Sequence, residues 1–512
     1  MGKKIIACDL GTGGNKASLY DEDGECLEST FIPYRTYYPH PGWHEQAPAE
    51  WFNSVIESIE YLLVKRKHER GDIVCISFSG HSLGVVPLDR EGRLLRERTP
   101  IWSDTRASNE AEIFFDKVDR TEWYMKTGNG FPPPCYPIFK IMWYKNNEYE
   151  MYRKVHKIVG TKDYINYKLT GNIFTDYSYA SGSGFFNLFS WRYDEDFIES
   201  AGLDSEHFPE VKASTFVVGN LLPEVAEKLG LNKNVVVVCG GVDNSCMALG
   251  AKNISEGRVY TSLGSSSWIA VSSGKPVLDP ETKPFVFAHV IPRMYTSAMS
   301  IFSAGTSLEW VKNNMFRDVI GQCEKTGDNI YEKLREMASK SPIGANKLIF
   351  NPSLAGGSSQ EPSPNIRGGY IGIDLGHTRE DLIRACFEGI AINLGIVLDE
   401  LKKHTRLRGQ MLMVGGGAKS ELWLQIFADV YNMEVLRTNI GQNAGSLGAA
   451  GCGAVGTGLW KDFNRIDEIH KTMDVKIPIP ENVEKYLKLK EVFSIVREYQ
   501  GKIGDLLASL DI

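Results

Sequence analysis

The sequence predicts an α/β protein built of two domains. Its 512 residues exceed what one hydrophobic core usually supports, so we expect one domain over 1–250 and a second over 251–512. Short apolar strands alternate with turns and amphipathic helices in both halves. A strand, a glycine-bearing turn and a second strand occur near the N-terminus and again around residue 264, so the second half echoes the first.

The first half favours an antiparallel meander followed by mixed elements. Apolar strands at 4–8 and 16–20 flank the first glycine turn, and Asp-Glu-Asp-Gly at 21–24 indicates the next turn. A helix from about residue 48 to 63 then leads to further strands at 73–79 and 85–88. Residues 107–230 are mainly helical in pattern, with prolines at 132–134 that cannot lie inside a helix, and predict an insertion on the first domain.

A buried strand is predicted to start the region between the two domains. Four consecutive valines at 235–238 run into Cys-Gly-Gly-Val-Asp, which predicts a strand, a tight turn and a helix of small residues at 247–250. The remaining pattern predicts strands at 259–263, 268–272 and 411–414, and helices at 380–403 and 419–432. A last amphipathic helix carrying Val483, Leu487, Val492, Val496 and Tyr499 is expected to pack on the core.

Composition excludes several classes of protein. Apolar residues make up 42% and charged residues 24%, as in ordinary globular proteins. The net charge of −7 gives no general attraction to nucleic acid or to anionic membranes, so we expect neither as a partner. The nine cysteines are scattered singly, which is typical of reduced thiols, and no apolar stretch resembles a signal peptide or a membrane span. We therefore expect a cytoplasmic location.

Three glycine-bearing segments, 9–14, 262–267 and 415–420, are the most informative part of the sequence. Glycine allows positive φ and close approach to a ligand, so successive N–H groups and small hydroxyls can point at phosphate oxygens. Together the segments predict one nucleotide site. Because they lie in both halves of the chain, we expect that site in a cleft between the two domains.

Asp9 is predicted to lie at the tip of the first strand, one residue before a glycine turn. A carboxylate there can hold a hard cation such as magnesium through water. Thr12 can donate its hydroxyl to a phosphate, the amides of Gly11 and Gly13 can do the same, and Lys16 would add positive charge. The alternative is a simple hairpin turn with an aspartate cap.

Asp243 occupies a similar strand tip next to Gly240 and Gly241, which leave open space above it. Phosphoryl transfer needs positioning, a metal ion and a base for the attacking hydroxyl, and we predict Asp243 as that base. Alternatively, Asp243 caps a helix that starts at Ser245.

Two further motifs are predicted to be coincidental. The Gly-x-Ser-x-Gly run at 80–84 matches a hydrolase nucleophile elbow, but a β-type run with a proline follows it instead of a helix. The segment 371–376 superficially repeats the first phosphate loop, but it lacks small hydroxyl residues, and we interpret it as a loop before a helix that starts near 377–380.

Taken together, these residues resemble the FGGY carbohydrate kinase family, and its xylulokinase-like members in particular, over nearly the whole chain. The resemblance rests on five segments: the first phosphate loop at 9–15, Trp-Ser-Asp-Thr-Arg at 102–106, a first signature at 137–143, a second signature at 368–391, and an adenosine segment at 415–430.

The resemblance implies two actin-like, ribonuclease-H-like domains that close over Mg-ATP and a sugar. Asp243 would be the base and Asp9 the magnesium-side carboxylate. The N-terminal domain would carry the sugar site and the first phosphate loop, and the C-terminal domain the second loop and the adenosine site. The other implied contacts are Gly264 and Ser265 with phosphate, Gly416, Gly417 and Ala418 with adenosine, and Asp104 and Asn244 with the sugar.

The sugar segment departs from the family pattern. Xylulokinases resemble Gly-Gln-Met-His-Gly where this chain has Gly-His-Ser-Leu-Gly at 80–84, and the Arg-Glu pair of glycerol kinases is absent from that segment. We therefore expect His81 and Ser82 to face a different small ketose or polyol. As a separate expectation, the protein could assemble as a homodimer. Two alternatives are a non-catalytic protein of the same fold that binds sugar and nucleotide, and an actin-like or chaperone ATPase.

Overall fold

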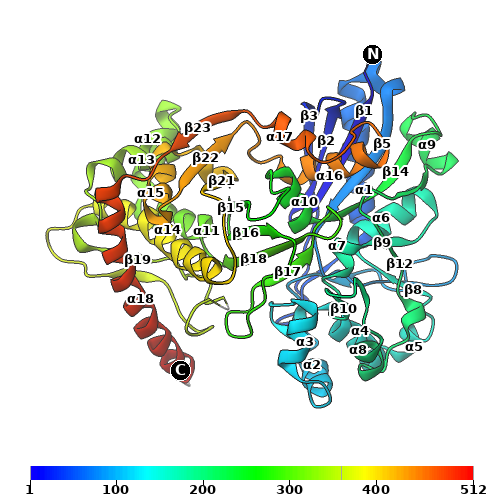
Figure 1. The fold of residues 1–512 in the computed structure, drawn as a ribbon, viewed down its shortest axis with the longest axis horizontal. Helices are drawn as coiled ribbons and strands as arrows, with labels where there is room; N and C mark the ends of the chain where they lie inside the picture. The colour runs from blue at the N-terminus through cyan, green and yellow to red at the C-terminus, as the bar shows by residue number, and fades with distance from the viewer. Residues whose placement is uncertain (1, 359, 511–512) are drawn as a thin grey trace. The chain divides into compact units, whose positions relative to one another are not determined.

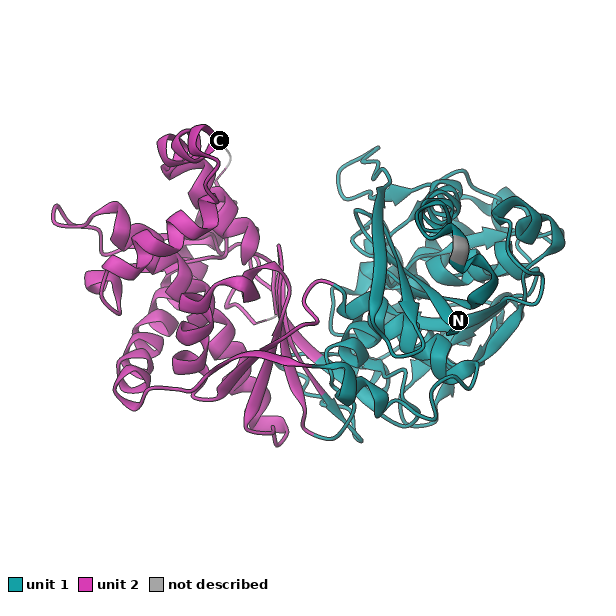
Figure 2. Ribbon diagram, turned by 90° about the horizontal axis from the view of Figure 1, so that it is seen from above, with its two compact units in different colours: residues 1–256, 272–297, 443–470 teal, residues 257–271, 298–442, 471–512 magenta. Residues whose placement is uncertain are grey.

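The computed structural model describes residues 2–358 and 360–510, and it is a mixed α/β structure as predicted. Packing divides the chain into two compact units (Figure 2). Unit 1 comprises residues up to 256, 272–297 and 443–470, and unit 2 comprises 257–271, 298–442 and 471 onward. Packing thus groups 443–470 with the first half of the chain, whereas the functional division predicted at residue 250 stays a prediction.

Unit 1 is organised around a six-stranded sheet whose central strands are parallel. β1, β5 and β14 pair in parallel, and β2 and β3 continue from β1 as the predicted antiparallel meander. In spatial order the strands are β13 (Val217–Asn220), β14 (Val236–Val242), β5 (Ile73–Gly80), β1 (Lys4–Gly11), β2 (Gly14–Asp21) and β3 (Cys26–Pro33).

Helices from distant parts of the sequence cover this sheet. α1 (Pro48–Lys65) packs on β2 and β3 through a buried apolar face that includes Trp51 and Val55. α16 (Ala444–Gly456), orange in Figure 1, packs on β1, β5 and β14 beside α10 (Asp243–Gly250). A Cβ on Gly448 would lie 1.9 Å from the carbonyl oxygen of Cys246, so the small residues of α16 permit this close packing.

The predicted insertion has a hydrophobic core of its own, in which aromatic side chains such as Phe114 and Phe139 pack together. Two of the three prolines form a short 3₁₀ turn, Pro133–Cys135, outside any α-helix. The elements between β3 and β14 not named above are β4 (Glu45–Gln46), β6 (Val86–Leu88), β7 (Thr99–Pro100), α2 (Ser108–Phe115), α3 (Arg120–Thr127), α4 (Pro137–Asn147), α5 (Tyr149–Tyr152), β8 (Lys157–Val159), α6 (Thr161–Thr170), β9 (Phe174–Asp176), α7 (Tyr177–Ala180), β10 (Phe186–Asn187), β11 (Arg192–Tyr193), α8 (Glu195–Ser200), β12 (Glu210–Lys212) and α9 (Pro223–Leu229). Unit 1 also holds β17 (Phe285–Ala288) and α17 (Arg465–Ile469).

Unit 2 repeats the arrangement of a hairpin beside parallel strands. β15 (Val259–Leu263) pairs antiparallel with β16 (Ser267–Ser273) and parallel with β21 (Gln410–Val414). Beyond β21 lie β22 (Glu434–Thr438), which is parallel to it, and β23 (Thr472–Lys476), which is antiparallel to β22. The strand β18 (Tyr295–Ile301) begins in unit 1 and enters unit 2 at Ala298. The other elements of unit 2 are α11 (Gly305–Met315), α12 (Arg317–Thr326), α13 (Ile330–Lys340), β19 (Ile349–Asn351), β20 (Gly369–Ile371), α14 (Arg379–His404), α15 (Glu421–Tyr431) and α18 (Pro480–Ala508).

The last helix exists as predicted, but its expected role in packing is only partly right. Val483 of α18 is buried, whereas Leu487, Val492 and Tyr499 are 52%, 48% and 61% exposed. The buried face instead uses residues such as Tyr486 and Phe493. The sequence pattern was ambiguous because apolar residues lie on more than one face of this helix.

Candidate active site

The carboxylate of Asp9 lies close to the end of β1, as predicted. It accepts a hydrogen bond of 2.6 Å from the hydroxyl of Ser79, its neighbour on the parallel strand β5. A Cβ on Gly445 at the start of α16 would lie 2.4 Å from Asp9 Oδ2, so only a glycine lets this helix approach so closely. Burial raises the pKa of Asp9, and the Ser79 hydrogen bond and the charge of Lys16 oppose that rise.

The turn after β1 exposes Thr12 and Gly13 to solvent. Side chains from the loop after β7 and from β4 hold it: Trp102 Nε1 donates to Thr12 Oγ1 at 2.9 Å, and Gln46 Nε2 donates to the Thr12 carbonyl at 2.8 Å. The sequence reasoning used Trp102 only as part of a signature and assigned it no contact. Its position two residues before Asp104 was the available signal.

Lys16 points along the same side of the β1–β2 hairpin and donates a hydrogen bond to Oδ1 of Asn443, just before α16. Burial lowers the pKa of Lys16, and the negative charge of Asp9 acts in the opposite direction. The sequence analysis missed Asn443 and Gly445. The run of small and amide residues at 441–446 could have drawn attention to both.

Asp243 is the first residue of α10, at the end of β14. The interpretation of Asp243 as the cap of a helix starting at Ser245 is wrong, because the helix begins at Asp243 and its N-cap residue is Val242. The carboxylate accepts hydrogen bonds from Asn244, at 2.8 Å from the backbone N–H and 3.0 Å from the side-chain amide. Burial raises the pKa of Asp243 to about 7, and the negative charge of Asp9 also raises it, against the two Asn244 bonds.

Tyr34 shows that the two carboxylates and the first turn share one neighbourhood of unit 1. Its hydroxyl donates a hydrogen bond to the carbonyl of Gly11. Burial raises the pKa of Tyr34 well above its ordinary value, and the charges of Asp9 and Asp243 act in the same direction. Unit 1 therefore brings two predicted acids together with the first glycine turn.

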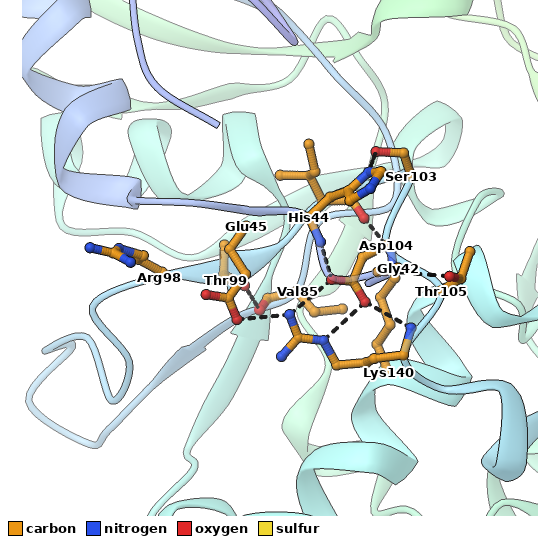
Figure 3. A network of polar contacts seen from close by, with 12 residues as sticks. Gly42, His44, Glu45, Val85, Arg98, Thr99, Ser103, Asp104, Thr105 and Lys140 are labelled. Carbon is orange, nitrogen blue, oxygen red and sulfur yellow. Dashed lines mark hydrogen bonds and ion pairs between the residues drawn. The ribbon is translucent and has the colours of Figure 1, made fainter. Parts of the chain in front are cut away.

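Asp104 lies inside a dense polar network (Figure 3). It is fully buried and accepts one hydrogen bond from the backbone of His44 at 2.7 Å and three from Arg106, at 2.8, 2.9 and 3.1 Å. Arg106 also pairs with Glu45 at 2.7 Å and lies 3.8 Å from the ring centre of Trp43. Both oxygens of Asp104 therefore hold the loop that presents Trp102.

His81 and Ser82 follow β5 but differ in surroundings. The His81 ring is 1% exposed, lies edge-on to Trp51, and is 3.3 Å from the hydroxyl of Thr161. Burial lowers the pKa of His81 to about 4, so the ring is neutral at physiological pH. Ser82 is 7% exposed, and among the described residues its hydroxyl has no hydrogen-bond partner.

Lys140, which belongs to the first signature segment, fixes the backbone at Leu83 and Ile101. Its buried ammonium group donates to the carbonyls of Leu83 at 3.2 Å and Ile101 at 2.6 Å, and burial lowers its pKa to about 8.

In unit 2 the second and third glycine segments meet at Leu263. Gly415 has φ +96°, and a Cβ there would lie 2.5 Å from the Leu263 carbonyl oxygen. A Cβ on Gly417 would lie 2.4 Å from the Leu263 side chain. Gly416 is exposed and Ala418 is buried on the 3₁₀ turn between β21 and α15.

The exposed turn at Gly264 and Ser265 lies against the start of α11. The carbonyl of Gly264 accepts a hydrogen bond from Gly305 at 2.9 Å, and that of Ser265 accepts one from Ala304 at 3.0 Å. Hydrogen bonds from the start of α11 thus fix the backbone carbonyls of the turn.

With this geometry in place, comparison with known proteins decides the family. Residues 4–250 match the N-terminal domain, and residues 259–457 the C-terminal domain, of the FGGY family of carbohydrate kinases. The chain belongs to this family. It is 31% identical to a xylulose kinase of Staphylococcus xylosus over 96% of this chain and 99% of the relative, and 28% identical to a gluconokinase of Bacillus subtilis over 96% and 95%.

The solved structures agree. A ligand-bound xylulose kinase from Lactobacillus acidophilus superimposes with a TM-score of 0.88 at 27% identity, covering 97% of this chain and 98% of that one. The predicted two-domain, actin-like α/β fold is therefore confirmed, and the protein is a sugar kinase, a phosphotransferase with an alcohol acceptor.

Neither motif set aside in the sequence of this FGGY kinase has the structural context of the site that it mimics. The Gly-x-Ser-x-Gly run ends β5 and leads to β6, so the helix that a nucleophile elbow requires is missing there. The segment 371–376 leaves β20 as an exposed loop, and α14 begins at Arg379 behind a capping box of Thr378 and Asp381. Both predictions are confirmed.

Metal-binding and membrane features were also sought in the kinase. Across residues 2–358 and 360–510, no group of three or more His, Cys, Asp or Glu residues could hold a metal ion. None of the described helices has the length and apolar character needed to cross a bilayer.

Proposed function

We propose that this sugar kinase transfers the γ-phosphoryl group of Mg-ATP to a hydroxyl of a small ketose or polyol resembling xylulose, with Asp243 as general base. The observation that supports this most is the carboxylate of Asp243, whose pKa is raised to about 7 beside Asp9. A general base is most effective when its pKa lies near the working pH. The named relatives, a xylulose kinase and a gluconokinase, act on substrates of this size.

Asp243 would accept the proton of the attacking hydroxyl. Its carboxylate is held in one orientation by the two hydrogen bonds from Asn244, so little reorganisation is needed when the substrate arrives. The negative charge of Asp9 raises the proton affinity of Asp243, which suits Asp243 to act as the base. Asp9 would then act on the magnesium side.

The residues around Asp9 fit a hydrated magnesium ion. One carboxylate oxygen accepts the Ser79 hydrogen bond, and the other lies close to Gly445, where a residue with a side chain would place a Cβ against it. Magnesium is usually held by one or two carboxylates, waters and substrate phosphates, so a larger acidic cluster is not required. When bound, Mg-ATP supplies the phosphoryl group, and its magnesium ion supplies a positive charge that offsets the negative charge of the phosphates.

The remaining nucleotide contacts are proposed as the sequence predicted them. In unit 1 the exposed turn of Gly11, Thr12 and Gly13, with Lys16, would contact phosphates. In unit 2 the exposed turn of Gly264 and Ser265 would do the same. The 3₁₀ turn at 416–418 would pack on adenosine through Gly416, Gly417 and Ala418.

On the acceptor side, Ser82 and Trp102 are the groups best placed for direct contact. The Ser82 hydroxyl is free to bind a sugar hydroxyl, and the ring of Trp102 is 38% exposed. His81 and Asp104 are occupied by their own neighbours, and we propose that they act on the sugar through the loops that they order.

A spectrophotometric assay of ADP formation against pentuloses, hexuloses, tetritols, glycerol and gluconate tests the proposal. We expect ATP-dependent transfer to one ketose or polyol. Binding of nucleotide and sugar without transfer across the whole panel would favour the non-catalytic alternative, and ATP hydrolysis independent of any sugar would favour a chaperone-like ATPase. The cytoplasmic location and the homodimer stay predictions.

The base is tested by Asp243→Asn. We expect turnover to fall roughly a hundredfold or more, the scale of lost general-base catalysis, while ADP binding measured by calorimetry is retained. Asp116→Asn, at the exposed aspartate that follows α2 as its C-cap residue, is the matched control and should keep full turnover. Near-native turnover of Asp243→Asn would contradict the assignment.

A further inference from the structure

The turn that presents Asp243 is shaped by an irregularity in β14. The pairing of β14 with β5 shifts register just before Gly241, and Gly240 has φ +70°. A Cβ on Gly240 would lie 1.9 Å from the carbonyl oxygen of Phe78, so only glycine fits there. Bulges next to active sites commonly redirect a side chain. The direction of Asp243 therefore depends on what holds the backbone at 239–242.

Hydrogen bonds from neighbouring segments hold this backbone. The N–H of Gly240 donates to the carbonyl of Ser214 at 2.9 Å. The N–H of Val242, directly before Asp243, donates to the hydroxyl of Ser178 at 2.9 Å. A side chain of α7 thus fixes the backbone one residue before the proposed base.

The Ser178 hydroxyl can accept this bond because Asp176 fixes its proton. Ser178 is fully buried, and its Oγ–H donates to Oδ2 of Asp176, the N-cap residue of α7. A hydroxyl has one proton and two lone pairs, so with its proton directed at Asp176 only lone pairs face the N–H of Val242. Backbone N–H groups of Ser178 and Tyr179 also donate to Asp176, at 2.9 and 3.3 Å. Asp176 therefore sets the orientation of the hydroxyl.

Asp176 is itself held by a buried cation. Nζ of Lys162, on α6, lies 2.9 Å from Oδ1 of Asp176 and 2.6 Å from Oδ1 of Asp163. All three side chains are at most 1% exposed. Burial opposes the charge of Lys162, yet the two neighbouring carboxylates raise its pKa well above the ordinary value. A buried polar network whose members are bonded to one another is rigid, so Asp176 has little freedom to turn.

We propose that Ser178 is a positioning residue for the general base, with Asp176 and Lys162 fixing the direction of its hydroxyl. This inference rests on the proposed function, because Ser178 acts only through Asp243. Displacement of a reacting group by about 1 Å can lower a rate roughly a hundredfold, so a small shift of this backbone should be visible in turnover.

Ser214 offers a matched control for Ser178. It is 2% exposed, and its hydroxyl donates at 2.7 Å to the same oxygen of Asp176 that Ser178 contacts. Ser214 reaches the turn through its backbone carbonyl, which alanine retains. Ser178→Ala and Ser214→Ala therefore both remove a buried hydroxyl from Asp176, but only Ser178→Ala removes the acceptor of the Val242 N–H.

Steady-state kinetics of the full chain test the proposal. The acceptors are pentuloses, hexuloses, tetritols, glycerol and gluconate, and the one that the unchanged protein phosphorylates fastest is used, at a temperature at which circular dichroism shows the variants folded. In Ser178→Ala we expect kcat to fall about tenfold or more, while the KM for ATP stays within about twofold. Ser214→Ala should keep kcat within about threefold.

A double-mutant cycle separates positioning from a general loss of structure. If Ser178 acts through Asp243, then Ser178→Ala should change kcat by less than about twofold in Asp243→Asn, whose base is already absent. A general loss of structure would lower kcat by the same factor in both backgrounds. Near-native turnover of Asp243→Asn would overturn the proposed function and this inference with it, whereas a normal Ser178→Ala beside an impaired Asp243→Asn would overturn the inference alone.

Two further results would overturn the inference: an equal loss of kcat in Ser214→Ala, and the same factor lost on adding Ser178→Ala to Asp243→Asn. If Ser178→Ala does not fold, Ser178→Cys takes its place, because a thiol keeps the shape of the side chain but is a weaker acceptor. Its kcat should fall by about threefold or more, and an unchanged kcat would equally overturn the inference.

Discussion

The first and second glycine turns share one local design but carry different chemistry. Asp9-Leu10-Gly11-Thr12 joins β1 to β2, and Ser262-Leu263-Gly264-Ser265 joins β15 to β16. In each case the first strand also pairs in parallel with a second strand, β5 or β21. The residue two positions before the first glycine is an acid in unit 1 and a serine in unit 2.

Neighbouring residues account for the difference between these turns. Asp9 is paired in register with Ser79, whose hydroxyl donates to its carboxylate, and it lies near a second acid, Asp243. Ser262 is buried and lies in register with the aliphatic Val414. A repeated backbone arrangement has therefore been given acids in unit 1 and only small hydroxyls and glycines in unit 2. Because a phosphate needs a cation from one side and N–H or hydroxyl donors from others, this asymmetry suits phosphoryl transfer.

The largest effect is expected when Asp9 of the first turn is replaced by serine, the residue at the equivalent position of the second turn. In Asp9→Ser we expect turnover to fall roughly a hundredfold or more, because the magnesium-side charge is lost. Turnover measured over a magnesium titration checks this result. Ser262→Ala is the control at the equivalent position of unit 2 and should change turnover only a few-fold. Equal losses in the two variants would show that the turns are not specialised.

The glycine at the meeting point in unit 2 is expected to have the next largest effect. Gly415→Ala places a Cβ 2.5 Å from the Leu263 carbonyl and requires a positive φ, so the free energy of unfolding should fall by about 2 kcal/mol. Urea unfolding measures the change. In Gly441→Ala the added Cβ would meet no described atom within 4 Å, so this matched variant should differ from the unchanged protein by less than about 0.5 kcal/mol. Similar unfolding of both variants would refute the close approach at Leu263.

The acids of unit 1 also predict a pH dependence. The pKa of Asp243 rises from 3.8 to about 7, so between these values the folded state holds more protons than the unfolded state, and stability falls as pH rises. Asp243→Asn removes this effect and should stabilise the protein by up to about 4 kcal/mol at pH ~8, and by less at pH ~5. Thermal unfolding at both pH values measures it. The same pKa predicts that kcat/KM rises through pH ~7 and then levels off. A profile flat down to pH ~5 would contradict both expectations.

The smallest effect is expected from the hydroxyl of the second turn. Ser265 is exposed, and its carbonyl, rather than its hydroxyl, carries the contacts to α11. Ser265→Ala should therefore leave stability unchanged and raise the KM for ATP a few-fold, about 1 kcal/mol for one lost hydrogen bond. Steady-state kinetics at saturating acceptor measures it, with Ser265→Thr as the variant that restores the hydroxyl. An unchanged KM would remove Ser265 from the proposed site.

Much of the local structure could be predicted because it depends on short-range pattern. The turns after β1 and β15 follow from glycine and small hydroxyls between apolar runs, and α14 starts where its capping box predicts. The start of α10 was placed late, at 247 or, in the capping alternative, at Ser245, since Asp is a common cap and nothing in the sequence shows that Val242 already occupies that position.

The neighbours of individual side chains were harder to predict than the helices and strands themselves. His81 was expected to face the acceptor, and the structure gives its ring Trp51 and Thr161 as neighbours. The exposed side of α18 was likewise not apparent, because apolar spacing alone does not tell which face of a helix finds a partner. Such contacts depend on residues that are far away in the chain.

By itself, the sequence determined the α/β class and the glycine turns at the tips of the strands, because turn geometry and strand periodicity are set by the few residues that form them. That the protein is a sugar kinase was implied by the resemblance of its motifs to the FGGY family. Tertiary structure alone decided which groups accompany these turns. Asn443 reaches Lys16 across 427 positions of the chain, and Gly445 admits α16 to Asp9 because that glycine has no side chain. The pKa of an acid depends on burial and on neighbouring charges, and only the folded chain supplies both.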